Sequence, residues 1–408
     1  MRAIVIPNPN EIEIREVPMP EVKEGEALLK VKYVGICGAD VASFTGNQPF
    51  TTYPRIPGHE FSAEIISIPE NDKGLKAGDV VTCNPYFNCG GCYSCERGFV
   101  NCCTDNQTMG VQRDGAFCEY ISMPIERIYA GKGLSAQELA LIEPFSISQH
   151  AVSRAEIKET DNVLIIGAGP IGLFALLAAK QKCNRIVVAD ILDNRLELAK
   201  EYGADAVVNT KTQSLEEFTK EFTNGNGFDV CIEACGAPET FLNCIDNAAF
   251  GANIILIGNG KRETSFVHSV ILKKELNIFG SRNALKDDFI NNIQLVKDGK
   301  ADVMKMVSGI YDMEKAYGKD PYEMFLSGPL SLVTIENDNA ENNKELVVFR
   351  DSFGSSLIPL MLEGYSKITV VDIRYISPQI LGEYVDFTDC DVLFIYNSLI
   401  LNQSNILK

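Results

Sequence analysis

The sequence predicts an α/β protein in three parts: a small β-barrel, a doubly wound parallel sheet, and a shorter α/β segment at the C-terminus. Three observations carry this prediction. Short alternating apolar runs separated by Gly and Pro fill residues 1–150, and strands alternate with helices over 151–285. After a return segment at 286–318, a second alternation of strands and helices occupies 319–408. A chain of 408 residues is long enough for two or three domains with separate cores.

Strands are expected in the first part where apolar residues alternate with polar ones. The runs are residues 1–7, 27–34, 61–68 and 79–83. In the second part, each buried strand appears as a short apolar run followed by a helical pattern, which implies a parallel sheet. The strands are 163–166, 185–190, 206–208, 228–233, 252–258 and 276–280, with helices at 173–180, 195–201 and 287–297.

Composition and charge exclude several classes of partner. The formal net charge of −18 argues against nucleic acid, because phosphate binding needs a basic surface. No apolar run approaches the roughly 20 residues that cross a bilayer, and the N-terminus lacks the features of a signal peptide. Among the 13 cysteines, those outside one dense cluster form no paired framework, which fits a reducing compartment. We therefore expect a soluble, cytoplasmic protein with no nucleic-acid or membrane partner.

The dense cluster lies in one short lobe, residues 84–106, and has the spacing C-x2-C-x2-C-x7-C. Four thiolates gathered in this way suit a closed, tetrahedral zinc site with no position left for chemistry. Two alternatives stay open here: free thiols or disulfides, and an iron–sulfur loop, whose fourth cysteine usually follows sooner. The four candidate ligands are Cys89, Cys92, Cys95 and Cys103.

A glycine-rich turn of the form G-x-G-x-x-G follows the first strand of the second part and opens a helix. Such glycines allow a tight turn, a close approach of the backbone to a pyrophosphate, and packing of the helix on the strand. Asp190 ends the next strand, where its carboxylate would accept the ribose hydroxyls and repel a 2′-phosphate, so NAD is favoured over NADP. A helix cap is the alternative for Asp190, and Arg195 either faces the adenine side or is solvated. The turn residues are Gly167, Gly169, Pro170, Ile171 and Gly172.

Ser281, Arg282 and Asn283 follow the last strand of the parallel sheet. Nicotinamide or substrate groups would lie at this edge of the sheet. His150 is expected at the junction between the first two parts rather than as a metal ligand.

A second metal constellation is suggested by His59, one of only three histidines. It is followed by Glu60, while Cys37 lies in a glycine-flanked segment and Glu143 precedes a proline. One thiolate, one imidazole and one or two carboxylates suit a zinc ion that keeps an exchangeable position. Spacing alone does not link Cys37, His59 and Glu143. Asp40 could orient His59 from outside the metal's ligand set.

These motifs together resemble the zinc-dependent medium-chain dehydrogenases, in which a GroES-like β-barrel catalytic domain is joined to a Rossmann domain. The resemblance covers residues 1 to about 317 and is carried by Gly35-Ile-Cys-Gly-Ala-Asp40, Gly58-His-Glu60, the cysteine lobe, Glu143-Pro144 and the glycine turn. Within that family, the segments 46–50, 143–148 and 280–283 resemble dehydrogenases of hexonates such as L-galactonate, and of related polyols.

The resemblance implies that Cys37, His59 and Glu143 bind a catalytic zinc ion, with Glu60 as an alternating or water-mediated ligand. It implies that the cysteine lobe binds a structural zinc ion. The expected activity is hydride transfer from a secondary alcohol of a sugar acid or polyol to NAD⁺, in a homodimer or homotetramer. The alternatives are a sugar-phosphate or threonine-type alcohol dehydrogenase, and a zinc- and NAD-binding protein with impaired catalysis.

The sequence departs from that family in two places. Many relatives carry Ser or Thr two residues after the metal-binding Cys and His three residues further on, a pair that relays the alcohol proton, but Ala39 and Ala42 occupy those positions. From about Leu326 the chain instead resembles the C-terminal part of the DHHW family of SGNH-hydrolase-like proteins, through segments 326–332, 349–354 and 371–375. Ser352 would lie at a nucleophile-like turn, yet no histidine follows His268 to act as its base. The tail is therefore expected to be a fragment without chemistry.

Overall fold

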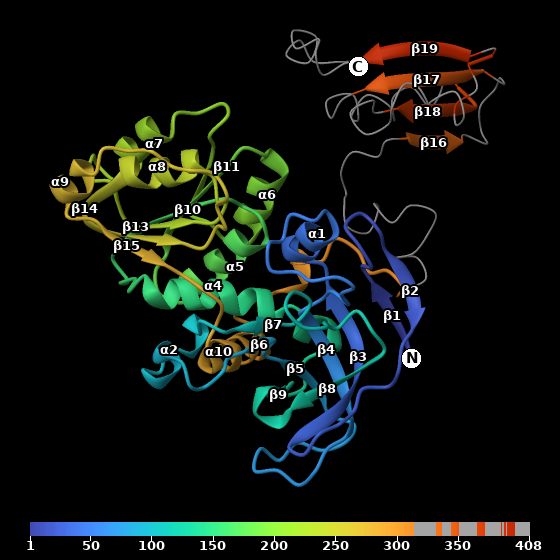
Figure 1. Cartoon of the computed structure of the whole chain (residues 1–408). Coiled ribbons are helices and arrows are strands. Elements are labelled where there is room, and N and C mark those ends of the chain that lie inside the picture. Colours follow the sequence, from blue (N-terminus) through green and yellow to red (C-terminus); the bar gives the residue numbers. More distant parts are fainter. Residues whose placement is uncertain are drawn as a thin grey trace. The chain divides into compact units, whose positions relative to one another are not determined.

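The computed structural model describes residues 1–313, 332–336, 344–350, 365–371, 385, 387–388 and 390–395 (Figure 1). The chain divides into two compact units, Met1–Tyr311 and Asp312–Lys408. Within the described residues, no helix has the length and apolar character needed to span a membrane.

Antiparallel strands build the N-terminal part of the first unit, as the alternation of apolar residues predicts. Five of them form one sheet in the order β8-β3-β4-β5-β9, and two short ribbons, β1-β2 and β6-β7, flank it. Alternate side chains such as Leu29, Phe61 and Ile65 point into a common apolar core. The strands are β1 (Arg2–Val5), β2 (Glu13–Glu16), β3 (Glu26–Gly35), β4 (Glu60–Ser67), β5 (Val80–Cys83), β6 (Tyr86–Phe87), β7 (Gln107–Thr108), β8 (Tyr120–Pro124) and β9 (Ile128–Ala130).

Short helices interrupt these strands where the site residues lie. One follows Cys37, two lie within the cysteine lobe, and two follow β8 and β9. They are α1 (Gly38–Phe44), α2 (Tyr93–Glu96), η1 (Val100–Cys102), η2 (Ile125–Arg127) and α3 (Ala136–Ala140).

The second part is a six-stranded parallel sheet in the order β12-β11-β10-β13-β14-β15. Numbered along the chain this order is 3-2-1-4-5-6, the doubly wound arrangement with a crevice where the direction of winding reverses. Every predicted strand of this sheet is confirmed, with small shifts at the ends. The strands are β10 (Asn162–Ile166), β11 (Arg185–Asp190), β12 (Ala206–Asn209), β13 (Phe228–Glu233), β14 (Ala248–Leu256) and β15 (Asn277–Gly280).

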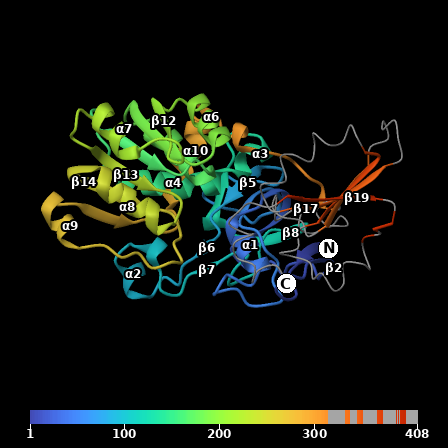
Figure 2. The same ribbon diagram turned by 90° about the horizontal axis from the view of Figure 1, so that it is seen from above.

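Helices cover both faces of the parallel sheet, as Figures 1 and 2 show. Val163 and Ile165 of β10 face the core shared with α4, α5 and α10, whereas Leu164 and Ile166 face the core shared with α7 and α8. This alternation explains why the strand is a continuous apolar run. The helices are α4 (Ile142–Arg154), α5 (Pro170–Ala179), α6 (Asp193–Glu201), α7 (Leu215–Phe222), α8 (Pro238–Asn247), α9 (Ser269–Lys274) and α10 (Lys286–Lys297), followed by η3 (Met304–Met306).

The second unit contains a four-stranded sheet in the order β16-β18-β17-β19. Strand β17 (Glu345–Arg350) is parallel to β18 (Lys367–Val371) and β19 (Cys390–Ile395), and β16 (Leu332–Glu336) is antiparallel to β18. Consecutive residues of β17 pack into separate apolar clusters, so both faces of this strand are buried. Ser352 lies outside the described residues, and the resemblance of the tail to the DHHW family stays a prediction.

Candidate active site and cofactor-binding site

The four cysteines of the lobe converge at a spacing that fits one tetrahedral ion. Their sulfur atoms all lie within 4.8 Å of one another. The Sγ atom of Cys103 is 3.6 Å from that of Cys89 and 3.9 Å from that of Cys92. A tetrahedron with Zn–S bonds of about 2.3 Å has sulfur–sulfur edges of about 3.8 Å, so the lobe fits zinc closely. A disulfide needs sulfur atoms about 2.05 Å apart, and all four cysteines are free thiols.

The backbone of the lobe is arranged to stabilise thiolates. The amides of Cys89 and Asp105 each donate to the Sγ atom of Cys103 over 3.3 Å. Hydrogen bonds from the backbone of Thr104 and Cys95 lower the pKa of Cys92 to about 5. Charged sulfur is the form that binds a metal ion.

The structure also brings together Cys37, His59 and Glu60, whose ligand atoms lie within 4.8 Å of one another. Cys37 directly precedes α1, and His59 and Glu60 stand at the start of β4. A Cβ atom at Gly35 would lie 2.5 Å from the Oε2 atom of Glu60, so a larger residue at this position would displace the carboxyl group. The Nδ1 atom of His59 is buried and has no hydrogen-bond partner among the described residues. An orphaned imidazole nitrogen beside a thiol and a carboxyl group is typical of a metal site.

Asp40 ties the two segments that carry these side chains. Its carboxylate accepts hydrogen bonds from the amide of Cys37 and the amide of Gly58, each over 2.9 Å. Only 1% of Asp40 is exposed. Asp40 therefore holds the backbone next to Cys37 and His59 in place, and it does not orient the His59 ring through a hydrogen bond.

Glu143 lies next to this cluster but outside the group of three. It occupies the first turn of α4, is buried, and accepts a hydrogen bond from the hydroxyl of Tyr86. The negative charge of Glu143 contributes to the raised pKa of Cys37 and of Glu60. Tyr86 is a site residue that sequence reasoning missed, because nothing in its local sequence points to a carboxyl group 57 residues away.

The charges of the buried acidic groups in this site favour the binding of a cation. Burial, followed by the charge of Glu60, raises the pKa of Cys37 well above its usual value. Burial, followed by the charge of Glu143, raises the pKa of Glu60 to about 7, and burial also raises the pKa of Asp40 and Glu143. Several acidic groups thus share one water-poor site with His59, whose pKa is raised because the charges of Asp40, Glu143 and Glu60 outweigh the effect of burial. A divalent cation reverses the shifts of the acidic groups by stabilising their charged forms, so the residues present fit zinc.

The glycine turn has the geometry that its sequence predicts. Gly167 has a φ of +107°, in the region that favours glycine. A Cβ atom on Gly172 would lie 1.7 Å from the carbonyl oxygen of Gly167, so only glycine permits this contact of helix and strand. The position of a Cβ atom on Gly169 is open, and Pro170 begins α5 without a side-chain cap. This leaves a helix N-terminus with free space in front of it, as a pyrophosphate requires.

Asp190 lies at the carboxyl end of β11 and contacts this turn. Its Oδ2 atom accepts from the amide of Ala168 over 2.7 Å, and its Oδ1 atom accepts from the amide of Ile191 over 2.7 Å. The helix-cap alternative is wrong, because the N-cap of α6 is Leu192 and this helix has no side-chain cap hydrogen bond. Asp190 instead fixes the backbone of the glycine turn, and its role toward the cofactor stays a prediction. Arg195 approaches it with an Nη1–Oδ2 distance of 3.9 Å.

Glu233, at the carboxyl end of β13, is a buried carboxylate that sequence reasoning missed. It accepts from the amide of Cys235 over 2.9 Å, from the amide of Gly236 over 2.9 Å, and from the hydroxyl of Thr240 over 2.7 Å. It thereby shapes the loop that borders the glycine turn, where the Sγ atom of Cys235 would lie 2.7 Å from a Cβ atom on Gly167.

Helix α4 joins the metal side of the site to the cofactor side. Glu143 stands in its first turn, and the hydroxyl of Ser148 donates to the carbonyl oxygen of Ile171 in the glycine turn over 2.7 Å. Phe145 of α4 stacks on Phe174 of α5 with ring centroids 5.2 Å apart. One rigid helix therefore positions both halves of the site.

Other candidates are placed as follows. Ser281 continues from β15 and donates its amide to the carbonyl oxygen of Leu256 over 2.9 Å, while Arg282 is exposed. Arg55 forms an ion pair with Asp114, with an Nη1–Oδ1 distance of 2.8 Å.

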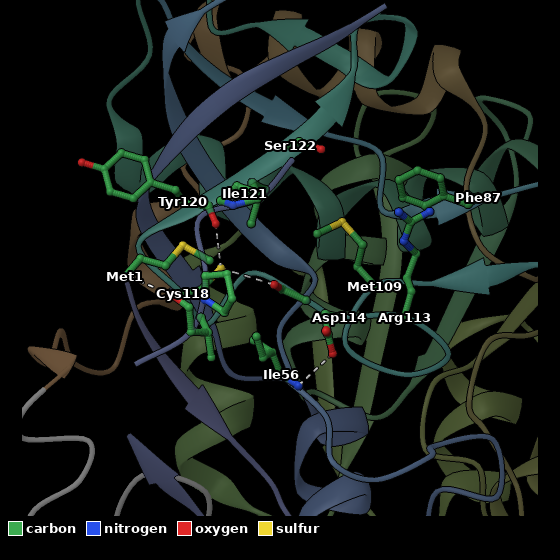
Figure 3. Close-up of a pocket in the computed structure, with 14 residues that line it drawn as sticks. Met1, Ile56, Phe87, Met109, Arg113, Asp114, Cys118, Tyr120, Ile121 and Ser122 are labelled. Atoms are coloured by element: carbon green, nitrogen blue, oxygen red, sulfur yellow. Dashed lines mark hydrogen bonds between the residues drawn. The ribbon is translucent and has the colours of Figure 1, made fainter. Parts of the chain in front are cut away.

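A cavity of about 420 Å³ lies elsewhere in the N-terminal part (Figure 3). Met1, Met109 and Ile121 line it, together with the polar side chains of Arg113 and Asp114. None of the predicted metal or cofactor residues contributes to its wall. The cavity is therefore separate from the site.

Comparisons with known proteins agree with this architecture. The family described as alcohol dehydrogenase GroES-like domain matches residues 23–132, and the family described as zinc-binding dehydrogenase matches residues 170–298. L-galactonate-5-dehydrogenase of Escherichia coli K12 is 37% identical over 308 residues, which are 74% of this chain and 90% of that protein.

Two further proteins show the same relationship. Sorbitol dehydrogenase of Bacillus subtilis is 33% identical over 323 residues, which are 77% of this chain and 91% of that protein. The crystal structure of the alcohol dehydrogenase RspB from Escherichia coli CFT073, complexed with NADH, is 30% identical, with a TM-score of 0.72 over 91% of this chain and 99% of that one. Sequence and fold therefore lead to one conclusion: the chain belongs to the zinc-dependent medium-chain alcohol and polyol dehydrogenases, oxidoreductases that bind zinc and a nicotinamide dinucleotide.

Proposed function

We propose that this chain oxidises a secondary hydroxyl group of a sugar acid or polyol, such as a hexonate, with NAD⁺ as hydride acceptor. The observation that carries the proposal is the convergence of Cys37, His59 and Glu60 in a buried cluster, joined through α4 to the glycine turn. The relatives that act on L-galactonate and sorbitol support this substrate class.

In this proposal Cys37 and His59 hold the catalytic zinc ion, and Glu60 and Glu143 complete its surroundings. A zinc ion held by these residues would lower the pKa of the substrate hydroxyl, and a dinucleotide bound at the glycine turn would accept the hydride. Glu60, at the start of β4, would serve as an alternating ligand or would hold a ligand water. Tyr86 holds the carboxyl group of Glu143 in place by donating to it.

The preference for NAD⁺ over NADP⁺ rests on Asp190. Its carboxylate, 7% exposed, stands at the end of β11 against the glycine turn. A 2′-phosphate at this edge would meet that negative charge, whereas two ribose hydroxyls would find an acceptor. Cys89, Cys92, Cys95 and Cys103 hold the second, structural zinc ion.

A sugar acid carries a carboxylate that an arginine side chain can recognise. Arg282 follows β15 at the cofactor edge and is exposed, and it makes no ion pair within the part of the chain that the structure describes. We assign the recognition of a substrate carboxylate to this side chain. Polyols without a carboxylate are then expected to have a higher KM than hexonates.

The test combines metal analysis with a substrate panel. The purified chain is expected to contain about two zinc ions, to bind NADH, and to reduce NAD⁺ with hexonates or polyols but not with threonine or sugar phosphates. Cys37→Ser should leave about one zinc ion and intact NADH binding, with loss of turnover. Turnover at the wild-type rate in Cys37→Ser would contradict the assignment.

A protein with impaired catalysis is the second candidate, because the tail replaces the C-terminal strand that completes the catalytic domain in the family. Ala39 and Ala42 also cannot relay a proton. Two zinc ions and tight NADH binding, with no turnover on any member of the panel, would favour it. The homodimer or homotetramer that we expect is tested by light scattering on the same preparation.

A further inference from the structure

A buried polar network connects the cysteine lobe to the loop that follows β15. The side-chain nitrogen of Asn101, in η1 between Cys95 and Cys103, donates to the carbonyl oxygen of Arg282 over 2.9 Å. In return, the side-chain nitrogen of Asn283 donates to the carbonyl oxygen of Asn101 over 3.2 Å. These two hydrogen bonds form a clasp between segments 181 and 182 residues apart in the chain.

The clasp is anchored on two helices. The same Nδ2 atom of Asn101 lies 3.1 Å from the Nε2 atom of His150 in α4. The Nδ1 atom of His150 lies 3.1 Å from a carboxylate oxygen of Asp288 in α10, and that oxygen also accepts from the amide of Leu285 over 2.8 Å. Asn101, His150 and Asp288 are each only 6% exposed. Since an amide nitrogen can only donate, His150 accepts through Nε2 and donates through Nδ1 to Asp288.

The loop needs these contacts because one of its residues has an unfavourable backbone conformation. Asn283 has a φ of +52°, a left-handed conformation that non-glycine residues rarely adopt, although Asn tolerates it better than most. Such residues persist where surrounding contacts fix them, and they are enriched at functional sites. Here the surrounding contact is the lobe itself.

The position of the 281–283 loop in the sheet indicates which half of the cofactor it faces. Asp190 ends β11 and Ser281 follows β15, and these strands are four places apart in the sheet order. Four strand spacings are about 19 Å, the reach of an extended dinucleotide across the crevice. With the adenine half at Asp190, the loop at 281–283 faces the nicotinamide half.

We propose that Asn101 is a positioning residue through which the four-cysteine lobe orders the 281–283 loop and so sets the affinity for the nicotinamide half of the cofactor. The proposal rests on the proposed function only in that the loop faces the cofactor. It makes the closed metal site a determinant of cofactor binding.

The first test compares two ligands on single variants. Asn101→Ala is expected to weaken NADH binding about tenfold, because the carbonyl oxygen of Arg282 and the Nε2 atom of His150 lose their donor. ADP-ribose, which lacks the nicotinamide, should bind as in the wild type. Zinc content should stay at about two per chain. Asn247→Ala is the matched control, since Asn247 is also buried and bonded through its side chain to Thr219 and Asn243, but at the far end of α8. Its NADH affinity should not change.

Asn283→Gly gives an independent version of this test, because glycine keeps the left-handed backbone and removes only the amide side chain. It should weaken NADH binding to a similar degree. The double variant Asn101→Ala/Asn283→Gly should lose less affinity than the product of the single losses, because both residues belong to one clasp. Should Asn101→Ala not accumulate as folded protein, Asn283→Gly decides alone.

The second test uses the reciprocity of coupled binding. If an ordered lobe favours NADH, saturating NADH must slow the release of the lobe zinc to a chromogenic chelator, and ADP-ribose must slow it less. In Asn101→Ala this protection should disappear. Equal NADH affinity in the wild type and both variants would overturn the proposal. A rate of zinc release that is the same with and without NADH would also overturn it. Failure of the wild type to bind NADH at all would instead refute the proposed function.

Discussion

Asp40 offers the sharpest test of how the catalytic metal site is held together. Its buried carboxylate accepts one hydrogen bond from the amide of Cys37 and one from the amide of Gly58, and so fixes the two segments that deliver Cys37 and His59. Replacing Asp40 by Asn preserves the size of the side chain. However, the amide keeps only one oxygen and turns an NH₂ group toward one of the two N–H donors.

The magnitude follows from these two contacts. A hydrogen bond to a charged acceptor contributes about 1.5–3 kcal/mol, and an unpaired buried donor costs about 1–3 kcal/mol. Burial raises the pKa of Asp40, so part of this loss is offset because the variant no longer buries an anion. We expect Asp40→Asn to lower the free energy of unfolding by about 2 kcal/mol and to weaken the catalytic zinc site about 10- to 100-fold.

The assay is zinc retention against a graded series of a chelator, read together with chemical denaturation. Asp40→Asn should lose one zinc ion at chelator concentrations where the wild type keeps both, and the lobe zinc should be unaffected. Asp161→Asn is the control, because Asp161 also accepts from a backbone amide, that of Lys158 over 2.8 Å, but at an exposed position. Wild-type zinc retention in Asp40→Asn would refute the reasoning that Asp40 organises the site.

Three further predictions concern the cofactor and the proton. Gly172→Ala should abolish NADH binding and lower Tm, because its Cβ atom would lie 1.7 Å from the carbonyl oxygen of Gly167; calorimetry that finds normal affinity would disprove the packing argument. Asp190→Ala should raise the NADP⁺/NAD⁺ ratio of kcat/KM at least about tenfold, since the charge that repels a 2′-phosphate is removed, and an unchanged ratio would exclude that role. Introducing Ser at Ala39 together with His at Ala42 supplies the relay that relatives carry and should raise kcat when proton release limits turnover. An unchanged kcat with a solvent isotope effect would place proton release on another route.

The sequence predicted best those features that depend on local pattern. The cysteine lobe has its ligands within 15 consecutive positions, 89 to 103, and its geometry follows from the spacing. The glycine turn likewise combines a strand end, a turn and a helix start in six residues. Alternating and continuous apolar runs located β3, β4 and β10 because burial on one or two faces leaves a periodic signal.

Features made by distant contacts left no such signal. Tyr86 meets Glu143 across 57 positions, and Asn101 meets Arg282 across 181. Neither pair has a characteristic spacing, and the residue types are common. The linkage of Cys37 with His59 was expected only by resemblance, because a thiol and an imidazole 22 positions apart have no fixed separation until β3 and β4 pair. Long-range pairing therefore has to be known before polar contacts of this kind can be found.

The role of α4 has a consequence for how this chain can change over evolutionary time. Glu143 and His150 are seven positions apart, two turns of one helix, so they project from nearly the same side. A single inserted or deleted residue between them would rotate one end against the other by about 100°. Such a change would misplace either the metal-side carboxylate or the partner of Asn101. The interval from 143 to 150 should therefore keep its length among descendants that stay active.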